Sequence, residues 1–77
     1  MTIKPLFIRA EWDEEASVWV ATSDDVPGLA TEAATMETLI EKLKVRIPEL
    51  LEANGMNIDN EVLFEVMTRR FEVAQTG

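Results

Sequence analysis

One stretch contains the signals that decide the fold: Ser17-Val-Trp-Val-Ala-Thr-Ser-Asp-Asp-Val-Pro-Gly-Leu-Ala-Thr-Glu-Ala-Ala-Thr-Met-Glu-Thr-Leu-Ile-Glu-Lys-Leu43. Its first seven residues carry β-branched and aromatic side chains in a pattern typical of a strand. Pro27 then sets φ for the first central position of a type II turn, and Gly28 accepts the positive φ of the second. The stretch therefore predicts a strand over residues 17–23 that leads into a tight turn.

A short strand over residues 29–33 and a helix are predicted after this turn. Thr35 is a good N-cap. Seven apolar residues behind it fall on one face of a helix: Met36, Leu39, Ile40, Leu43, Ile47, Leu50 and Leu51. Asn54-Gly55 tolerates the left-handed conformation that ends helices. Pro48 interrupts the stripe, and its missing N–H and bulky ring predict a kink or a restart of the helix.

The predicted secondary structure is completed by residues 6–12 and 61–73. Residues 6–12 predict a first strand, because they alternate between two faces: Leu6, Ile8, Ala10 and Trp12 on one, and Phe7, Arg9 and Glu11 on the other. A polar hairpin loop follows them. Residues 59–60, Asp and Asn, are predicted to be loop. Frequent β-branched and aromatic residues favour a strand over 61–73, with a bulge near residues 69–70. A last helix is the alternative for this segment.

The order strand, strand, strand, helix, strand predicts an α+β fold in which a helix covers one face of a sheet, a two-layer sandwich. A right-handed crossover through the helix sets the last strand beside the first and parallel to its neighbour. With 77 residues, the chain is short enough to be a single domain, residues 1–77.

Apolar side chains on both faces of the first two strands predict self-association. A sheet with a helix on one side and water on the other alternates more cleanly between apolar and polar residues. Phe7 and Trp19 are in excess of what one core needs, and a second copy of the chain is the simplest cover for the second face. We therefore expect Phe7 and Trp19 in the interface of a homo-oligomer.

The composition argues against several classes of function. Fifteen acidic residues against seven basic ones give a formal charge of −8, which repels nucleic-acid phosphates and predicts no direct nucleic-acid binding. On charge alone we favour the interpretation that acidity keeps a small domain soluble, and a basic protein partner with complementary charge is the alternative. The chain has no cysteine, and it shows no signal peptide or membrane-spanning segment. We expect a cytoplasmic protein that does not bind membranes.

The sequence offers little catalytic chemistry. Without histidine or cysteine, the commonest general base, the commonest zinc ligands and the thiol nucleophile are missing. We therefore expect neither enzymatic activity nor a cofactor. A small metal-dependent hydrolase, with Glu11, Asp13 and Asp24 or Asp25 around Mg²⁺, is an alternative. Solvated turn carboxylates are favoured, because these acids lie on a turn and at opposite ends of a strand.

Asp24, Asp25, Pro27 and Gly28 form an acidic turn and are the predicted partner-binding residues. Aspartate side chains often bond the backbone of their own turn, so a structural role is open to both acids. Contact with a partner is the functional interpretation, because binding residues concentrate on loops that a rigid scaffold holds.

An ordered set of motifs within residues 1–53 resembles the HicB-like antitoxin domains. The set comprises Glu11 to Glu15, Val18 to Ala21, Ser23 to Leu29, Thr31 to Ala33 and Thr35, followed by the amphipathic helix. The chain is most similar to a small single-domain branch of that superfamily. The motifs shared with this branch are Trp12-Asp13, Asp24 to Leu29, Ile47 to Leu51 and Asn54-Gly55.

The resemblance implies a partial ribonuclease-H-like fold without the catalytic carboxylates. In typical HicB antitoxins this domain masks HicA, a small basic mRNA-cleaving toxin, and a C-terminal domain binds DNA. This sequence ends at Gly77, and we therefore expect it to lack the DNA-binding domain. We therefore expect a non-catalytic protein-binding module that neutralises a small basic HicA-like toxin. A structural homo-oligomer is the alternative, ahead of the metal-dependent hydrolase.

Overall fold

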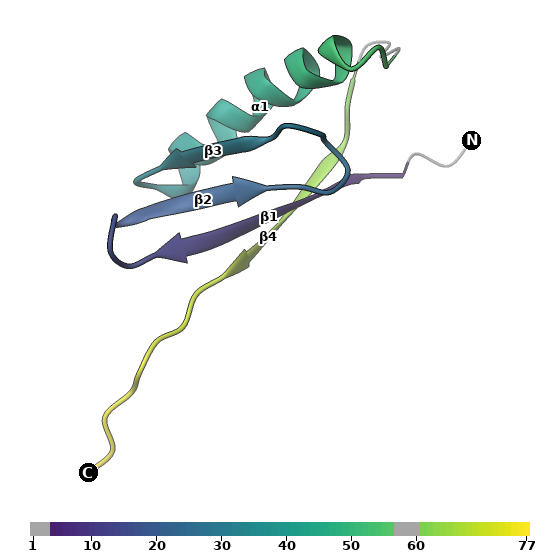
Figure 1. Cartoon of the computed structure of the whole chain (residues 1–77). Helices are drawn as coiled ribbons and strands as arrows, with labels where there is room; N and C mark the ends of the chain where they lie inside the picture. Colours follow the sequence, from purple (N-terminus) through teal and green to yellow (C-terminus); the bar gives the residue numbers. More distant parts are fainter. Residues whose placement is uncertain (1–3, 57–60) are drawn as a thin grey trace.

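The computed structural model describes residues 4–56 and 61–77, and within them the secondary-structure elements follow the predicted order. The elements are β1 (Leu6–Asp13), β2 (Val18–Thr22), β3 (Ala30–Ala33), α1 (Met36–Ala53) and β4 (Phe64–Arg69). Figure 1 shows two layers, with α1 lying over one face of the sheet. The predicted α+β class is therefore confirmed. The loop predicted at residues 59–60 lies outside the described residues.

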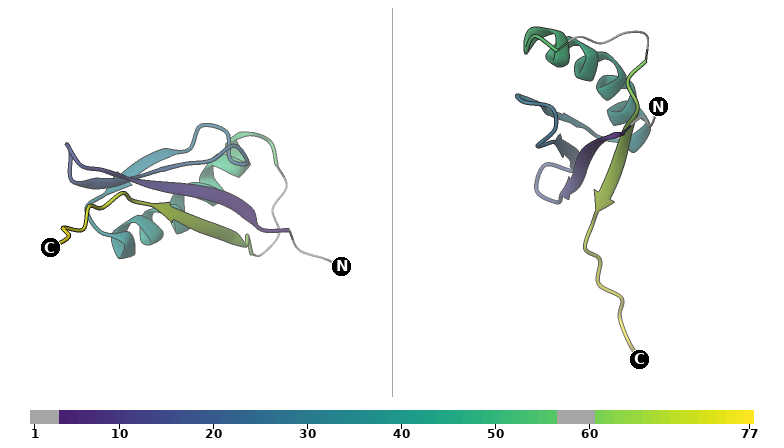
Figure 2. Two further views of the ribbon diagram at one scale, coloured as in Figure 1. Left: turned by 90° about the horizontal axis from the view of Figure 1, so that it is seen from below. Right: turned by 90° about the vertical axis from the view of Figure 1, so that its right-hand side faces the viewer.

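The sheet is mixed, and its strand order is β3-β2-β1-β4. β2 pairs antiparallel with β1 and with β3, whereas β4 pairs parallel with β1. This parallel pairing, which sets Leu6 beside Phe64 and Ile8 beside Val66, confirms the predicted crossover through the helix. The helix alternative for residues 61–73 is wrong, and β4 ends at Arg69, where a bulge was expected. Beyond Arg69 the chain runs away from the body as an extended tail (Figures 1 and 2).

The core lies between α1 and one face of the sheet. The helix contributes the stripe that its sequence predicts, with Leu39, Leu43, Ile47 and Leu51 buried. The sheet and its loops contribute Ile8, Ala10, Ala21, Val26, Leu29 and Ala33. Each large aliphatic side chain buried in this way stabilises the fold by about 1.5–3 kcal/mol. Small alanines on the strands let the helix approach the sheet closely.

Local signals set both ends of α1. The Thr35 side chain accepts a hydrogen bond from the Thr38 amide at 3.2 Å, as an N-cap does. At the other end Asn54 is the C-cap and Gly55 has a φ of 75°. The helix continues through Pro48, so the restart that the sequence predicts there is wrong. Burial of the stripe on both sides of Pro48 outweighs the one backbone hydrogen bond that proline removes.

Phe7 and Trp19 lie on opposite faces of the sheet, so the prediction that they share one face is wrong. Trp19 pairs with Trp12 across β1 and β2, in the same row as the buried residue Ala21. Its ring packs edge-to-face on Trp12, with 5.3 Å between the ring centroids. Phe7 belongs to the other row, on the open face. Both rows of β2 are apolar, so alternation alone does not show which row the helix covers.

Replacing Leu43 by alanine tests the buried stripe. We expect Leu43→Ala to lower the free energy of unfolding by about 2–5 kcal/mol, because it leaves a cavity beneath the helix. Urea denaturation followed by circular dichroism measures the loss. The matched control is Val45→Ala on the same helix, where the side chain is 59% exposed. Equal losses in the two variants would contradict the packing described above.

Candidate functional site

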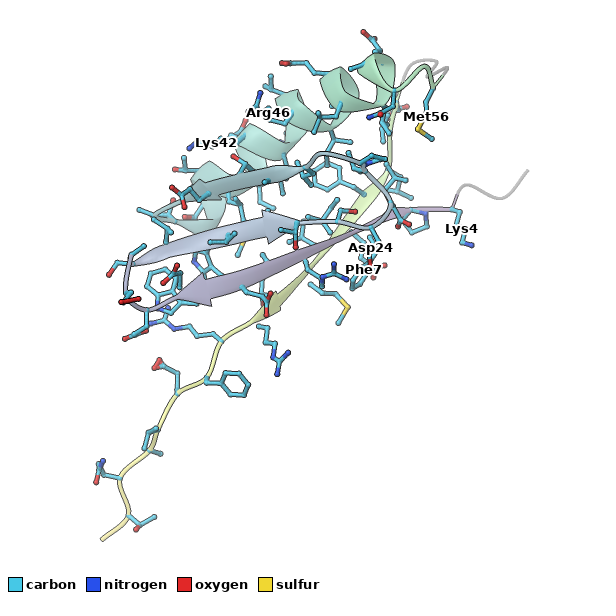
Figure 3. All side chains as sticks on the ribbon, viewed as in Figure 1. Lys4, Phe7, Asp24, Lys42, Arg46 and Met56 are labelled. Atoms are coloured by element: carbon cyan, nitrogen blue, oxygen red, sulfur yellow. The ribbon has the colours of Figure 1, made fainter. Side chains whose placement is uncertain are left out.

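The loop from Ser23 to Leu29 joins β2 to β3 and contains all four predicted partner-binding residues. Figure 3 shows Asp24 and Phe7 at the same end of the sheet, near the start of β1. Asp24, Asp25, Pro27 and Gly28 are exposed, whereas Val26 and Leu29 are buried in the core. The two buried residues therefore anchor the loop in the core, and the four exposed residues between and before them are available to a partner.

Three hydrogen bonds fasten the start of the loop to β1. The Phe7 amide donates to the Asp25 carboxylate at 2.8 Å, and the Ser23 hydroxyl donates to the Phe7 carbonyl at 2.5 Å. The Asp25 amide in turn donates to the Ser23 hydroxyl oxygen at 3.0 Å. These contacts continue the β1–β2 ladder, whose last backbone pair joins Arg9 and Thr22. Asp25 thus has a structural role, holding β1 rather than its own turn.

The second half of the loop is the tight turn that the sequence predicts. The Leu29 amide donates to the Val26 carbonyl at 3.1 Å, and Gly28 has a φ of 85°, the positive value that favours glycine. The Asn54 side-chain amide donates to the Pro27 carbonyl at 3.3 Å, which ties the turn to the end of α1. The loop is therefore anchored at both ends by residues distant in the sequence.

Asp24 differs from Asp25 because its carboxylate points into solvent and contacts another side chain. Its side chain is 86% exposed and accepts hydrogen bonds from both terminal nitrogens of Arg9, at 3.1 and 3.3 Å. This hydrogen bonding, together with the positive charge of Arg9, lowers the pKa of Asp24 below its ordinary value. The same contact raises the pKa of Arg9. Arg9 and Ser23 are not among the residues predicted from the sequence, because their roles depend on the register of β1 against the loop.

The four carboxylates proposed for the metal-dependent hydrolase do not gather. Glu11 and Asp13 lie toward the end of β1, next to the first hairpin, whereas Asp24 and Asp25 lie near its start. Among residues 4–56 and 61–77, no three histidine, cysteine or acidic side chains are placed to hold a metal ion. In the same part of the chain, no helix is long and apolar enough to cross a membrane.

Removing the Ser23 hydroxyl tests the attachment of the loop. We expect Ser23→Ala to lower the free energy of unfolding by about 1–2 kcal/mol, because it leaves the Phe7 carbonyl and the Asp25 amide without their partner. Urea denaturation measures this loss, and faster amide exchange at Asp25 locates it. Ser17→Ala in the exposed first hairpin is the matched control. A loss in Ser17→Ala as large as that in Ser23→Ala would refute the attachment.

The Arg9 contact predicts a pH dependence. The folded pKa of Asp24 lies below its unfolded value, so the contact stabilises the fold fully above the unfolded pKa. That contribution is lost as the pH falls through the lower, folded pKa. Carboxyl ¹³C NMR should show Asp24 titrating at a higher pH in Arg9→Gln than in the original chain. Lys44→Gln, which removes a positive charge on α1, should leave this midpoint in place.

Comparison with known proteins identifies the family. Residues 5–75 match a family described as "Domain of unknown function (DUF1902)". The hypothetical protein TTHA1013 from the extremely thermophilic bacterium Thermus thermophilus has a solved structure that is similar to this chain. It is 54% identical, with a TM-score of 0.80 over 92% of this chain and 100% of that one. No curated protein matches the sequence. Since the family match spans most of its length, the chain belongs to the DUF1902 family.

Proposed function

We propose that this chain is a non-catalytic protein-binding module that docks a small basic protein on the Ser23–Gly28 loop. One observation carries the proposal: the loop is fastened at both ends, yet the Asp24 carboxylate is 86% exposed. A loop held in this way loses little conformational freedom on binding, which favours affinity. Rigidly held surface loops are also where binding residues concentrate in other proteins.

The Asp24–Arg9 ion pair provides a way to accept a basic side chain. The pair is exposed to solvent, and exposed ion pairs contribute little net stability. An arginine or lysine of the partner can therefore replace Arg9 on the Asp24 carboxylate at small cost. The formal charge of −8 attracts such a partner over a longer range and speeds its association.

The proposed class of partner is a small basic toxin that cleaves mRNA. This class rests on the resemblance of the sequence to HicB-like antitoxin domains, which mask HicA toxins. The observed order of strands and helix supports the partial ribonuclease-H-like fold that the resemblance implies. The cytoplasm is then the proposed location, because mRNA is the substrate of such a toxin.

Capture from the protein's own cells tests the proposal. We expect the tagged chain to retain a small basic protein at low salt and to release it as salt rises, because screening weakens charge attraction. Mass spectrometry identifies the retained protein, and an RNA-cleavage assay with and without this chain measures neutralisation. Retention of no basic protein at either salt concentration would contradict the proposal.

Neutralising Asp24 locates the contact. We expect Asp24→Asn to slow association with the captured protein several-fold at low salt and to reduce the salt dependence of the rate. Stopped-flow fluorescence of the tryptophans measures the rate. Glu15→Gln is the matched control, because it removes the same charge from the hairpin at the other end of β2. If both variants slow association equally, the total charge matters and the loop is not the docking site.

A further inference from the structure

The outer edge of β4 is open for pairing with another strand. β4 is the last strand of the sheet, next to β1. The Leu6 amide donates to the Leu63 carbonyl, so the backbone of odd-numbered residues faces β1. Alternation along the strand then directs the N–H and C=O groups of Phe64, Val66 and Thr68 to the outer edge. Figure 2 shows β4 at the margin of the sheet, with the tail continuing past the body.

The opposite edge of the sheet is better protected. β3 has only four residues, and short edge strands are poor templates for pairing. The Lys42 ammonium group also donates to the Glu32 carbonyl of β3 at 2.7 Å. Within residues 4–56 and 61–77, no side chain makes a comparable hydrogen bond to the backbone of β4. The two edges therefore differ in their readiness to accept a strand.

Exposed apolar side chains concentrate on the last segment, in and around β4 and on the tail. Six large apolar side chains are exposed in the described part of the chain: Val45, Met56, Leu63, Met67, Phe71 and Val73. Four of them belong to the last segment, and all four have odd numbers. The Arg69 guanidinium lies 4.9 Å from the centroid of the Phe71 ring, which puts Phe71 on the side of Arg69. The start of the tail therefore lies next to the row that β4 begins.

About Met67, the residues of this row match in polarity and are opposite in charge. An acidic residue, Glu65, lies two positions before Met67, and a basic one, Arg69, lies two positions after it. Large apolar residues flank them, Leu63 on one side and Phe71 on the other. A second copy running antiparallel, with a two-fold axis at Met67, would place unlike charges together. The pairs across the axis are Leu63 with Phe71, Glu65 with Arg69, and Met67 with Met67.

We propose that two copies of this chain pair antiparallel through β4 and the tail, about a two-fold axis at Met67. Such an isologous interface is self-complementary, because each contact occurs twice. The two sheets become one continuous sheet, and both α1 helices lie on the same side of it. Opposite charges on facing strands stabilise the pairing, and like charges oppose it. The proposal does not depend on the binding of a basic partner.

The even-numbered row supports the same register. The Arg70 guanidinium lies 4.4 Å from the ring centroid of Trp12, on the helix side of the sheet. In the proposed register the half-buried Phe64 of the second copy lies opposite Arg70. Phe64 would then extend the aromatic group of Trp12 and Trp19 across the two-fold axis. In the proposed dimer, each copy thus covers aromatic side chains that the helix of the other copy leaves half-exposed.

Other two-fold registers lose the charge complementarity. An axis at Glu65 or at Arg69 faces two like charges directly across the strands, which is unfavourable. An axis at Val66 sets Glu65 opposite Met67, and an axis at Thr68 sets Met67 opposite Arg69. Among registers centred on residues 65–69, only the axis at Met67 pairs both charged residues with opposite partners.

A single introduced cysteine tests the axis, because the chain has no cysteine of its own. In the proposed register the two Met67 residues form a non-hydrogen-bonded pair with Cα atoms about 4.5 Å apart, within disulfide range. We expect M67C, treated with oxidised glutathione, to form a covalent dimer. E65C is the matched control, since its two Cα atoms would be about 14 Å apart at 3.4 Å per residue. No crosslink in M67C, or equal crosslinking in both, would overturn the proposal.

A charge exchange tests the pairing without a crosslink. We expect E65K and R69E each to weaken the dimer about tenfold, since each puts like charges at two symmetric positions. The double variant E65K/R69E restores opposite charges at both positions and should recover most of the affinity. Sedimentation velocity near 0.15 M salt measures association, and circular dichroism checks folding. A monomeric original chain, or a double variant no better than either single one, would overturn the proposal.

Discussion

The burial of one helical stripe against one face of the sheet is the interaction on which the rest of the structure depends. Leu39, Leu43, Ile47 and Leu51 are all buried, and each removes a large apolar side chain from water. The stripe packs mainly over β2 and β3. Since one helix does not cover four strands equally, β4 is covered only in part: Phe64 and Val66 are half-buried against the core, and the outer edge of the strand stays open.

The loop between β2 and β3 is part of the same core. Val26 and Leu29 are buried with the helix, and Asn54 at the end of α1 donates to the turn between them. The exposed position of Asp24 follows from these anchors, because the chain between two fixed points has little choice of path. The backbone of Phe7 in β1 is hydrogen-bonded to Ser23 and Asp25 of the proposed docking loop, and β1 is the neighbour of β4. A dimer that pairs through β4 would therefore present two such loops. Two loops on one rigid body would raise the avidity for a partner that offers two sites.

Much of the fold could be predicted from local patterns in the sequence. Alternation predicted the strands, helical spacing predicted the buried stripe, and Pro27-Gly28 predicted the tight turn. The candidate site could be predicted only in part. Its four residues were placed on the correct loop, but the Arg9 contact and the Ser23 hydrogen bonds were not predicted. Both involve residues far apart in the sequence, and they depend on a register that local patterns leave open.

The sequence by itself determined both ends of the helix and the tight turn at Pro27-Gly28, because caps and turns act through neighbours along the chain. Thr35 and Gly55 are examples, since each acts on the backbone within one helical turn. Only the tertiary structure decided which apolar row of β2 faces the helix, and therefore that Trp19 lies half-buried on the helix side of the sheet. It also decided that the helix continues through Pro48. In both cases the packing of surfaces that are distant in the sequence outweighs a local preference. The pattern of neighbouring residues does not reveal how large that packing contribution is.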